Sequence, residues 1–477
     1  MSFLVYDLTF LGLFVILLGI FLYRKRKNVK REGLLLLYKT NWGVKLIHRI
    51  GEKYQKTLKV LSYISVGLGY ILMVSVLYLI GKVVWIYTTQ GAFVKAVKIP
   101  PIMPLIPYLP QIFKLSFLPP FYFTYWIIII AVIAITHEFA HGIFATRKKV
   151  KIKSTGFGFF PFFFPIFLAA FVELDEKEMG KKKKFDQLAV LSAGTFVNTL
   201  TAIFFFVILL GFFAVAFAPS GVVFDTYPYT QINISSVTAI NNITVNDPSY
   251  SSVLSLINGN SSLNEVQTNL GNYLLTKNFL EQQNGSEGSL IVYYDAPAIR
   301  ANLDSTILSI NGEKITNVIQ LASVIHQYSP DTSIIVTVLN QNNSAENKTI
   351  TLGQDPNNKS LSWLGIGFLQ TQNQGILNQF YSTLSSFDRN HVYYASLMGD
   401  SGIFIYDLLW WLIMISISVA LINMLPVGIF DGGRFFYLTI LAMTKKEKVA
   451  KRVFQIVTYF FLLLLLVVML FWIFYIK

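Results

Sequence analysis

Six long apolar stretches limit the folds that this chain can adopt. A run of about 20 apolar residues is long enough to cross the hydrocarbon core of a bilayer as a helix. Hydrophobic residues make up 54% of the 477 residues, and mean hydropathy is +0.54. We therefore expect a polytopic α-helical membrane protein with about six transmembrane helices. The stretches lie at about 3–23, 60–86, 121–146, 186–217, 404–430 and 452–476.

The positive charges cluster at the ends of these stretches. Residues 24–59 hold twelve Lys and Arg, and 147–153, 177–184 and 445–452 hold five each. Residues 218–403 hold only six Lys and Arg against thirteen Asp and Glu. Because basic loops stay in the cytoplasm, we expect both termini and residues 218–403 to lie on the extracellular side of the cell membrane. The net charge of +14 then indicates contact with membrane lipids and gives no support to a nucleic-acid partner.

Seven glycosylation sequons agree with this topology, because all of them fall inside the expected external region. Their first residues are Asn233, Asn242, Asn260, Asn284, Asn342, Asn347 and Asn358.

The third apolar stretch contains the sequence HEFAH at residues 137–141. On a helix His137 and His141 share one face, where two neutral imidazoles can bind one zinc ion, and Glu138 is a candidate general base. A charged acid at the bilayer centre costs roughly 2.5–3.5 kcal/mol, so ionisable groups there usually face a wet or metal-binding interior. The alternative is two histidines that only cap or pack a helix. With no cysteine in the chain, a zinc site needs imidazole and carboxylate ligands.

A catalytic zinc usually has three protein ligands and a water, so a third ligand is expected. Asp431 is a lone acid at the end of the fifth apolar stretch. We expect Pro426 and the pair Gly432 and Gly433 to break the helix and let Asp431 turn toward the metal. An ion pair between Asp431 and Arg434 is the alternative.

Residues 154–172, STGFGFFPFFFPIFLAAFV, are as apolar as the spans but contain two glycines and two prolines. This composition argues against a straight helix. Basic residues both precede and follow the segment, so we expect a re-entrant loop that enters and leaves the membrane on the cytoplasmic side. Irregular backbone at that depth is tolerated against protein or a wet cavity, which places the loop beside the active site as a substrate-presenting element. An interfacial aromatic anchor is the alternative.

The external region has two parts that differ in composition and sequence pattern. Residues 219–285 are rich in Asn, Ser and Thr, which predicts loops and short strands. Residues from about 286 to 354 show strand patterns, a helix-like stretch and an NG hairpin turn at Asn311 and Gly312. This part resembles the PDZ domain of membrane-associated proteases, an α+β domain that generally binds peptide ends by strand addition. His326 and His391 have no partner at ligand spacing, and we expect both to be structural or solvated.

Three motifs in order resemble the site-2 protease family of intramembrane zinc metalloproteases, of archaeal or bacterial type. HEFAH fits the family's HExxH, and NMLPVGIFDGG, from Asn423 to Gly433, fits its N-x-x-P-x-x-x-x-D-G. SAGTFVNTLTA around Asn198 resembles its middle A-G-x-x-x-N segment, so the resemblance covers about 121–440. It implies zinc ligands at His137, His141 and Asp431, a catalytic base at Glu138, and substrate-positioning or oxyanion-stabilising roles for Asn198 and Asn423.

The expected function is zinc-dependent hydrolysis of a peptide bond within or near the transmembrane helix of single-pass, membrane-anchored substrates, in regulated intramembrane proteolysis. A membrane metal-ion transporter and a catalytically inactive PDZ scaffold are the alternatives. The expected parts are two amino-terminal helices with a cytoplasmic loop (1–120), the catalytic core in two pieces (121–217 and 404–440), the external region (218–403) and a last helix (441–477).

Overall fold

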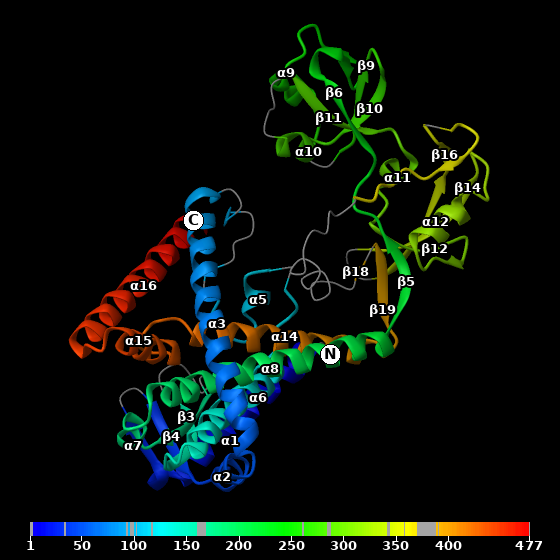
Figure 1. The fold of residues 1–477 in the computed structure, drawn as a ribbon. Coiled ribbons are helices and arrows are strands. Elements are labelled where there is room, and N and C mark those ends of the chain that lie inside the picture. Colours follow the sequence, from blue (N-terminus) through cyan, green and yellow to red (C-terminus); the bar gives the residue numbers. More distant parts are fainter. Residues whose placement is uncertain are drawn as a thin grey trace. The chain divides into compact units, whose positions relative to one another are not determined.

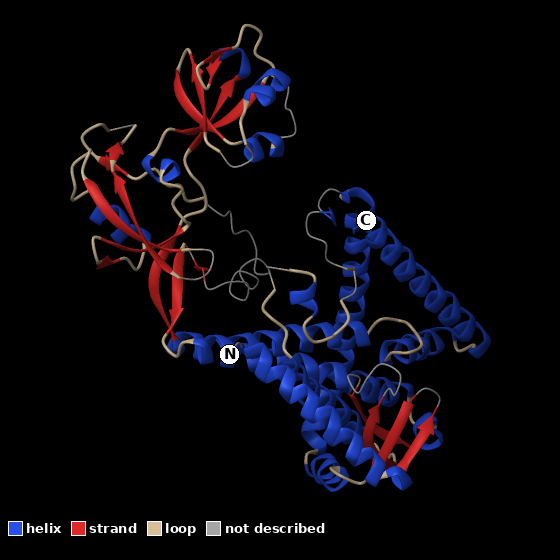
Figure 2. Cartoon of the chain, turned by 180° about the vertical axis from the view of Figure 1, so that it is seen from behind, coloured by secondary structure: helices blue, strands red, loops and turns tan. Residues whose placement is uncertain are grey.

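The computed structural model divides into two compact units, which we describe separately (Figures 1 and 2). Unit 1 comprises Met1–Phe213 and Ile403–Lys477, and unit 2 comprises Ala214–Gly402. The structure describes residues 3–32, 35–91, 94–95, 100–101, 103–115, 118–159, 168–259, 262–283, 288–340, 344–356, 358–369, 388–389 and 391–476.

Six helices among the described residues are long and apolar enough to cross a membrane, which agrees with a polytopic helical membrane protein. Five lie close to the expected bounds, but the fifth ends at Asn423, seven residues earlier than expected. The six are α1 (Phe3–Arg24), α3 (Gln55–Thr89), α6 (Phe123–Arg147), α8 (Lys184–Ala216), α14 (Asp400–Asn423) and α16 (Glu447–Ile476). Shorter helices of unit 1 are η1 (Arg26–Asn28), α2 (Val44–Lys53), α5 (Leu109–Ile112), α7 (Glu176–Gly180) and α15 (Asp431–Thr444).

Helices α3, α6, α8, α14 and α15 share one apolar core (Figure 1). Small residues allow α3 and α8 to approach closely: Ser65 and Ser192 join their hydroxyls at 2.7 Å, and Gly69 lies against Ser192. Small and hydroxyl side chains serve this purpose in membrane bundles, where apolar burial against lipid gives little net attraction.

A buried acid fixes the start of α6. Asp7 of α1 is 1% exposed and accepts hydrogen bonds from the backbone amides of Phe123 and Thr124 at 2.8 and 2.9 Å. The hydroxyls of Thr124 and Tyr108 also donate to it, at 2.5 and 2.6 Å. Asp7 therefore caps a neighbouring helix, and its negative charge suits the positive end of that helix. Burial and the bond to Asp7 raise the pKa of Tyr108, which keeps its hydroxyl a donor.

The described parts of residues 154–172, which are 154–159 and 168–172, form no helix, as expected, and belong instead to a four-stranded antiparallel sheet. Residues 160–167 of the expected re-entrant loop lie outside the described residues, and its entry into the membrane stays a prediction. Gly156 is required in the sheet because a Cβ there would collide with the carbonyl oxygen of Tyr38. The strands, in sheet order, are β1 (Val29–Glu32), β2 (Leu35–Thr40), β3 (Ile152–Phe159) and β4 (Leu168–Leu174).

Unit 2 contains two larger antiparallel sheets (Figure 2). The six-stranded sheet has the order β6-β11-β10-β9-β7-β8 and packs on one apolar core with α9 and α10. Its elements are β6 (Tyr229–Asn233), η3 (Ile234–Ser236), β7 (Val237–Ile240), β8 (Ile243–Thr244), α9 (Tyr250–Leu256), β9 (Asn264–Thr268), β10 (Gly271–Leu275), α10 (Lys277–Gln282) and β11 (Ser289–Tyr294).

The second sheet has the order β15-β14-β12-β5-β19-β18, with β13 paired to β12. Ile310 pairs with Glu313 across Asn311 and Gly312, which both have positive φ, so the predicted NG hairpin is present. Strand β11 of the expected PDZ-like stretch belongs to the other sheet, and a PDZ fold stays a prediction. The elements are β5 (Phe217–Val223), α11 (Pro297–Arg300), β12 (Thr306–Ile310), β13 (Glu313–Lys314), α12 (Val318–Ile325), β14 (Ser333–Leu339), β15 (Ala345–Thr351), β18 (Asp388–Arg389) and β19 (Val392–Ser396), with β16 (Gly353–Gln354) and β17 (Ser362–Trp363) as a separate pair.

Candidate metal centre

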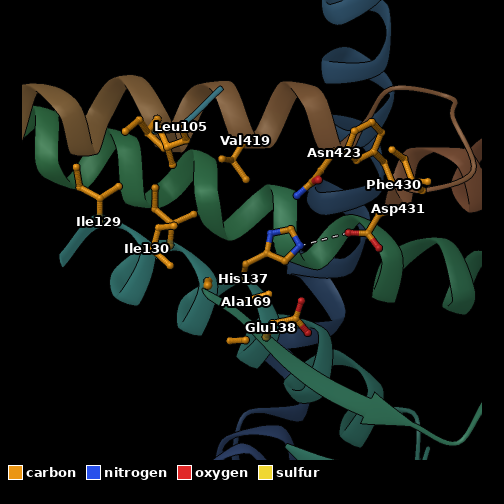
Figure 3. Close-up of a pocket in the computed structure, with 15 residues that line it drawn as sticks. Leu105, Ile129, Ile130, His137, Glu138, Ala169, Val419, Asn423, Phe430 and Asp431 are labelled. Atoms are coloured by element: carbon orange, nitrogen blue, oxygen red, sulfur yellow. Dashed lines mark hydrogen bonds and ion pairs between the residues drawn. The ribbon is translucent and has the colours of Figure 1, made fainter. Parts of the chain in front are cut away.

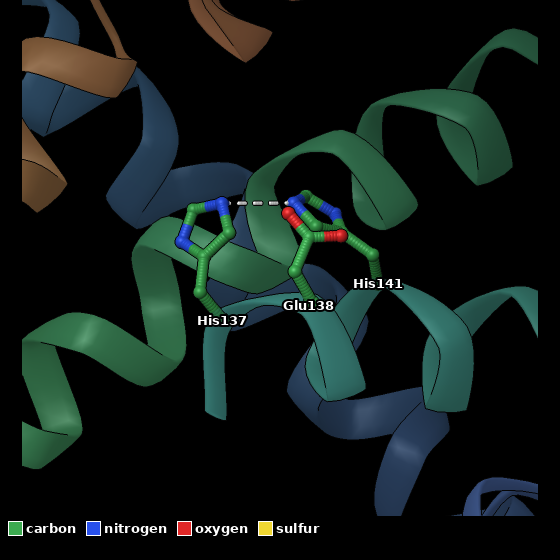
Figure 4. Close-up of side chains that lie close together, drawn as sticks. All are labelled: His137, Glu138 and His141. Carbon is green, nitrogen blue, oxygen red and sulfur yellow. Dashed lines mark hydrogen bonds between the residues drawn. The ribbon is translucent and has the colours of Figure 1, made fainter. Parts of the chain in front are cut away.

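Three candidate ligand atoms meet inside unit 1. His137 and His141 lie one turn apart on α6, and their Nε2 atoms are 3.0 Å apart (Figure 4). Asp431 directs Oδ2 to His137, at 3.3 Å (Figure 3). The same oxygen lies 3.2 Å from Nε2 of His141. The two imidazoles are about 10% exposed and the carboxylate 27%. The structure thus brings together the three residues for which the sequence predicted a common metal.

Asp431 reaches the histidines because the chain breaks between α14 and α15. Helix α14 ends at Asn423 and α15 begins at Asp431, so the predicted helix break is present, over residues 424–430. The prediction that the glycine pair helps to break the helix is wrong, because Gly432 and Gly433 both lie in the first turn of α15. A Cβ on Gly432 would collide with the backbone of Met424, so this glycine lets the turn pack on the preceding loop.

The alternative partner of Asp431 is engaged elsewhere. Arg434 donates to the carboxylate of Glu176 on α7 at 3.2 Å. Asp431 has the two imidazoles as its neighbours instead, so the ion pair between Asp431 and Arg434 is absent from this structure.

The triangle of ligand atoms has the dimensions of a zinc site. Four ligands placed tetrahedrally at about 2.05 Å from Zn²⁺ lie about 3.3 Å from one another. The three edges here are 3.0, 3.2 and 3.3 Å. Two imidazole nitrogens and one carboxylate oxygen are also a donor set that zinc accepts in catalytic sites, with the fourth position left for water. The residues present therefore fit a zinc ion.

The second ring nitrogen of His141 is oriented by α8. Its Nδ1 atom lies 2.7 Å from the carbonyl oxygen of Val190, which can only accept a hydrogen bond. Nδ1 must therefore carry the proton, and Nε2 keeps the lone pair that a metal needs.

His137 meets the side chain of Asn198, also on α8. Nδ2 of Asn198 lies 2.9 Å from Nδ1 of His137, while Oδ1 is buried and has no hydrogen-bond partner among the described residues. Turning the amide by 180° exchanges these atoms, so that Nδ1–H donates to Oδ1 and the orphaned oxygen gains a partner. This orientation also leaves Nε2 of His137 unprotonated. The unpaired oxygen is thus explained if His137 binds a metal through Nε2.

Glu138 lies beside the two imidazoles and is attached to the sheet. Ligand atoms of Glu138, His137 and His141 all lie within 4.8 Å of one another. Oε2 of Glu138 accepts a hydrogen bond from the backbone amide of Val172 on β4 at 2.9 Å. The carboxylate is therefore held next to the metal ligands by an edge strand.

A cavity of about 360 Å³ opens onto this group (Figure 3). His137, Glu138 and Asp431 form its polar part, and Asn423 at the end of α14 also lines it. Asn198 does not line the cavity and is fully buried against His137. The remaining walls are Leu105, apolar side chains of α6 and α14, the loop before α15, and Ala169 and Ala170 of β4.

A model of peptidase family M50 matches residues 125–468, which include all six predicted site residues. The chain belongs to peptidase family M50. This is the site-2 protease family of membrane metallopeptidases, so the predicted family is confirmed, while the archaeal or bacterial type and the PDZ domain stay predictions. Among curated proteins, none matches this sequence.

Sequence reasoning missed two contributors to this M50 centre. Gly194 on α8 allows the rings to approach, because a Cβ there would lie 2.5 Å from Nε2 of His137 and 2.6 Å from Nε2 of His141. Asp7 fixes the start of α6. An isolated acid inside an apolar span was a signal that could have identified Asp7.

Proposed function

We propose that the protein is an intramembrane zinc endopeptidase that cleaves single-pass membrane proteins within or near their transmembrane helices. The observation that carries this proposal is the triangle of Nε2, Nε2 and Oδ2 atoms with Glu138 beside it, at one end of an apolar cavity. A metal with an acid beside it in a cavity of this kind is the arrangement that hydrolysis needs.

The three ligands would be His137, His141 and Asp431. When bound there, Zn²⁺ acts as a Lewis acid that polarises a carbonyl group and makes water acidic enough to attack it near neutral pH. Glu138 takes a proton from the attacking water and later gives it to the nitrogen of the leaving amine. The bond from Val172 fixes Oε2, and we assign the proton transfer to Oε1. Asn423 lies in the cavity, where its side-chain amide can donate to the carbonyl oxygen of the substrate.

The edge of β4 supports a site for an unwound substrate. A helical substrate hides its carbonyls in its own hydrogen bonds, so it must open locally before cleavage. Strand β4 is the last strand of its sheet, and the amide of Val172 points away from β3 toward Glu138. Since backbone groups alternate along a strand, we expect the amide of Ala170 on the same edge, and Ala170 also lines the cavity. Pairing with this edge would replace the bonds that the substrate loses.

A groove in unit 2 supports a role in peptide binding by the same enzyme. It has a volume of about 120 Å³ and lies between α12 and residues 362–368. Leu321, Ala322 and Ile325 line it from the helix. An apolar groove between a helix and an extended segment suits the end of a peptide. We propose that it receives an exposed end of the substrate outside the membrane, with both chain termini and residues 218–403 on that side.

Transport and scaffolding are separated from proteolysis by one experiment. The protein is placed in nanodiscs with a single-pass substrate, and zinc content and peptide-bond cleavage are measured for wild type, Glu138→Gln and His141→Ala. We expect Glu138→Gln to keep its zinc and to lose cleavage by roughly 10²–10⁴-fold, since general acid–base catalysis contributes about that much. His141→Ala should lose both.

Other results would favour the alternatives. Equal cleavage by wild type and Glu138→Gln would exclude the proposed base. Zinc uptake into vesicles without cleavage would favour a transporter, and substrate binding without zinc or cleavage would favour a scaffold.

A further inference from the structure

A second cavity lies between the ends of α3, α6 and α8 in unit 1, away from the groups of the metal centre. Its volume is about 380 Å³. Four cationic side chains and one carboxylate line it, together with two aromatic rings. The lining residues are Lys59, Tyr63, Arg147, Lys148, Lys183, Phe185 and Asp186.

The positive charge of this cavity is only partly compensated. Asp186 forms an ion pair with Lys148. Arg147 donates to neutral oxygens, the Gln55 carbonyl and the Ser62 hydroxyl, both at 3.2 Å. For the two remaining cations, Lys59 and Lys183, no ion pair occurs within the part of the chain that the structure describes. The cavity therefore carries an excess of positive charge. Such charge attracts anions strongly where protein partly excludes water.

Three separate basic clusters of the sequence converge here. Lys59 ends the cluster of residues 24–59, Arg147 and Lys148 begin that of 147–153, and Lys183 belongs to that of 177–184. Like charges repel, so their convergence on one cavity favours an anionic occupant. The fourth cluster, at 445–452, does not line the cavity.

The surroundings of the cavity are those of a lipid and not of a free anion. Tyr63 and Phe185 contact each other at its rim, with ring centroids 4.7 Å apart, and aromatic rings are typical of the depth of lipid headgroups. On the outer face of α3, Val60 is 60% exposed and Ile64 51%. Val60 directly follows Lys59 on α3 and Ile64 lies about one turn further, so an acyl chain can lie along these two side chains while its phosphate stays in the cavity.

We propose that this cavity binds the phosphate headgroup of an anionic phospholipid. Cationic pockets between transmembrane helices on the basic side of the membrane are suited to such headgroups. Arg147 donates to the phosphate through its guanidinium, and Lys59 and Lys183 supply point charges from α3 and from the residue before α8.

The bound headgroup joins the ends of three helices, and two of these, α6 and α8, also build the metal centre. Helix α6 carries the two histidines and ends at Arg147. Helix α8 begins beside the cavity and, within its first fifteen residues, supplies the Val190 carbonyl and Asn198. A lipid that clamps these ends should therefore stabilise unit 1 as a whole, because it binds the folded arrangement only.

Native mass spectrometry and thermal unfolding of the full-length protein test this proposal. The protein is titrated with phosphatidylglycerol or with phosphatidylcholine, and unfolding is repeated in nanodiscs of each composition. We expect phosphatidylglycerol to bind and to raise Tm. The double variant Lys59→Gln with Lys183→Gln should bind it roughly tenfold or more weakly, since each basic residue near an anionic surface contributes about a fivefold factor.

A matched control removes the same charge from the cluster that does not line the cavity. Lys446→Gln with Lys448→Gln, two exposed positions, should bind phosphatidylglycerol as wild type does. Equal weakening in both double variants would show a general charge effect and overturn the proposal. So would equal binding of the two lipids by wild type, or inorganic phosphate that raises Tm as much as phosphatidylglycerol does, because the occupant would then not be a lipid.

Discussion

Asn198 holds its side-chain amide 2.9 Å from Nδ1 of His137, at the ring nitrogen opposite the one that faces Asp431. The sequence motif implied that Asn198 contacts the substrate. Its position favours a different role, in which it sets the tautomer and orientation of a metal ligand. The middle motif then acts through α8, where Gly194 and Asn198 are four residues apart and so share one helix face.

Replacing Asn198 should therefore weaken metal binding before it affects anything else. We expect Asn198→Leu, which keeps the size of the side chain, to lower zinc affinity about 10- to 100-fold, the usual effect of losing such a partner. Asn198→Asp should restore much of the affinity, because a carboxylate also accepts from Nδ1–H. Zinc competition with a fluorescent chelator measures both variants. A purely substrate-binding role would leave the zinc affinity of both variants unchanged.

Gly194→Ala should move the two histidines away from the positions in which they can bind one zinc ion. The added methyl group would lie 2.5 Å from His137, well inside contact distance, so the rings must move. We expect zinc affinity to fall by about 100-fold or more, since small displacements of residues that bind the metal directly are poorly tolerated. Gly211→Ala on the same helix is the control, because a Cβ there meets nothing within 4 Å. Equal zinc content of the two variants would contradict the proposed steric role.

Much of this arrangement followed from local sequence. The thickness of the hydrocarbon core fixes the length of a spanning helix, so six apolar runs predicted six helices. A helix turn brings residues four apart together, so His137 and His141 could be paired from their spacing alone. Asp431 could be chosen as the third ligand because it is a lone acid that follows Pro426, a residue that disfavours a continuous helix.

Contacts between distant segments could not be predicted in this way. Strand β2 pairs with β3, more than a hundred residues later, and nothing in the sequence of either strand specifies the partner. The bond between Glu138 and Val172 depends on that sheet, and so it was missed as well. The glycine pair was expected to break the helix, whereas Gly432 serves a close packing contact with Met424, and a glycine pair in the sequence is compatible with both.

The cap that Asp7 provides predicts a specific loss of stability. Asp7→Asn removes the negative charge that the amino-terminal end of α6 favours. It also replaces one of the two accepting carboxylate oxygens by an NH2 group, which can only donate. We expect a destabilisation of about 1–3 kcal/mol, and about 1 kcal/mol for Tyr108→Phe, which removes one of the four bonds. Unfolding in mixed micelles measures both. Tyr6→Phe, at a 60% exposed position on the same helix, is the control and should unfold as wild type does.

The groove beside α12 predicts a peptide-binding defect that leaves the fold intact. Ala322 is an exposed residue that lines the groove, so Ala322→Arg fills it without disturbing the core. Ser323→Arg adds the same charge at the next position, which does not line the groove. With a peptide that ends in an apolar residue, fluorescence anisotropy should show about tenfold or weaker binding for Ala322→Arg only. Loss of binding in both variants would place the peptide elsewhere.

The outward amide of Ala170 tests how the substrate is held. Proline at this position removes one donor from the edge of β4 but breaks no bond to β3, and an edge strand tolerates it. We expect kcat/KM for a single-pass substrate to fall about two- to tenfold, the net contribution of one backbone hydrogen bond, while zinc content and Tm stay unchanged. Ala170→Ser keeps the donor and should cleave as wild type does. If both variants cleave at the wild-type rate, the substrate does not pair with β4 at this residue, and the bond between Val172 and Glu138 serves only to hold the base.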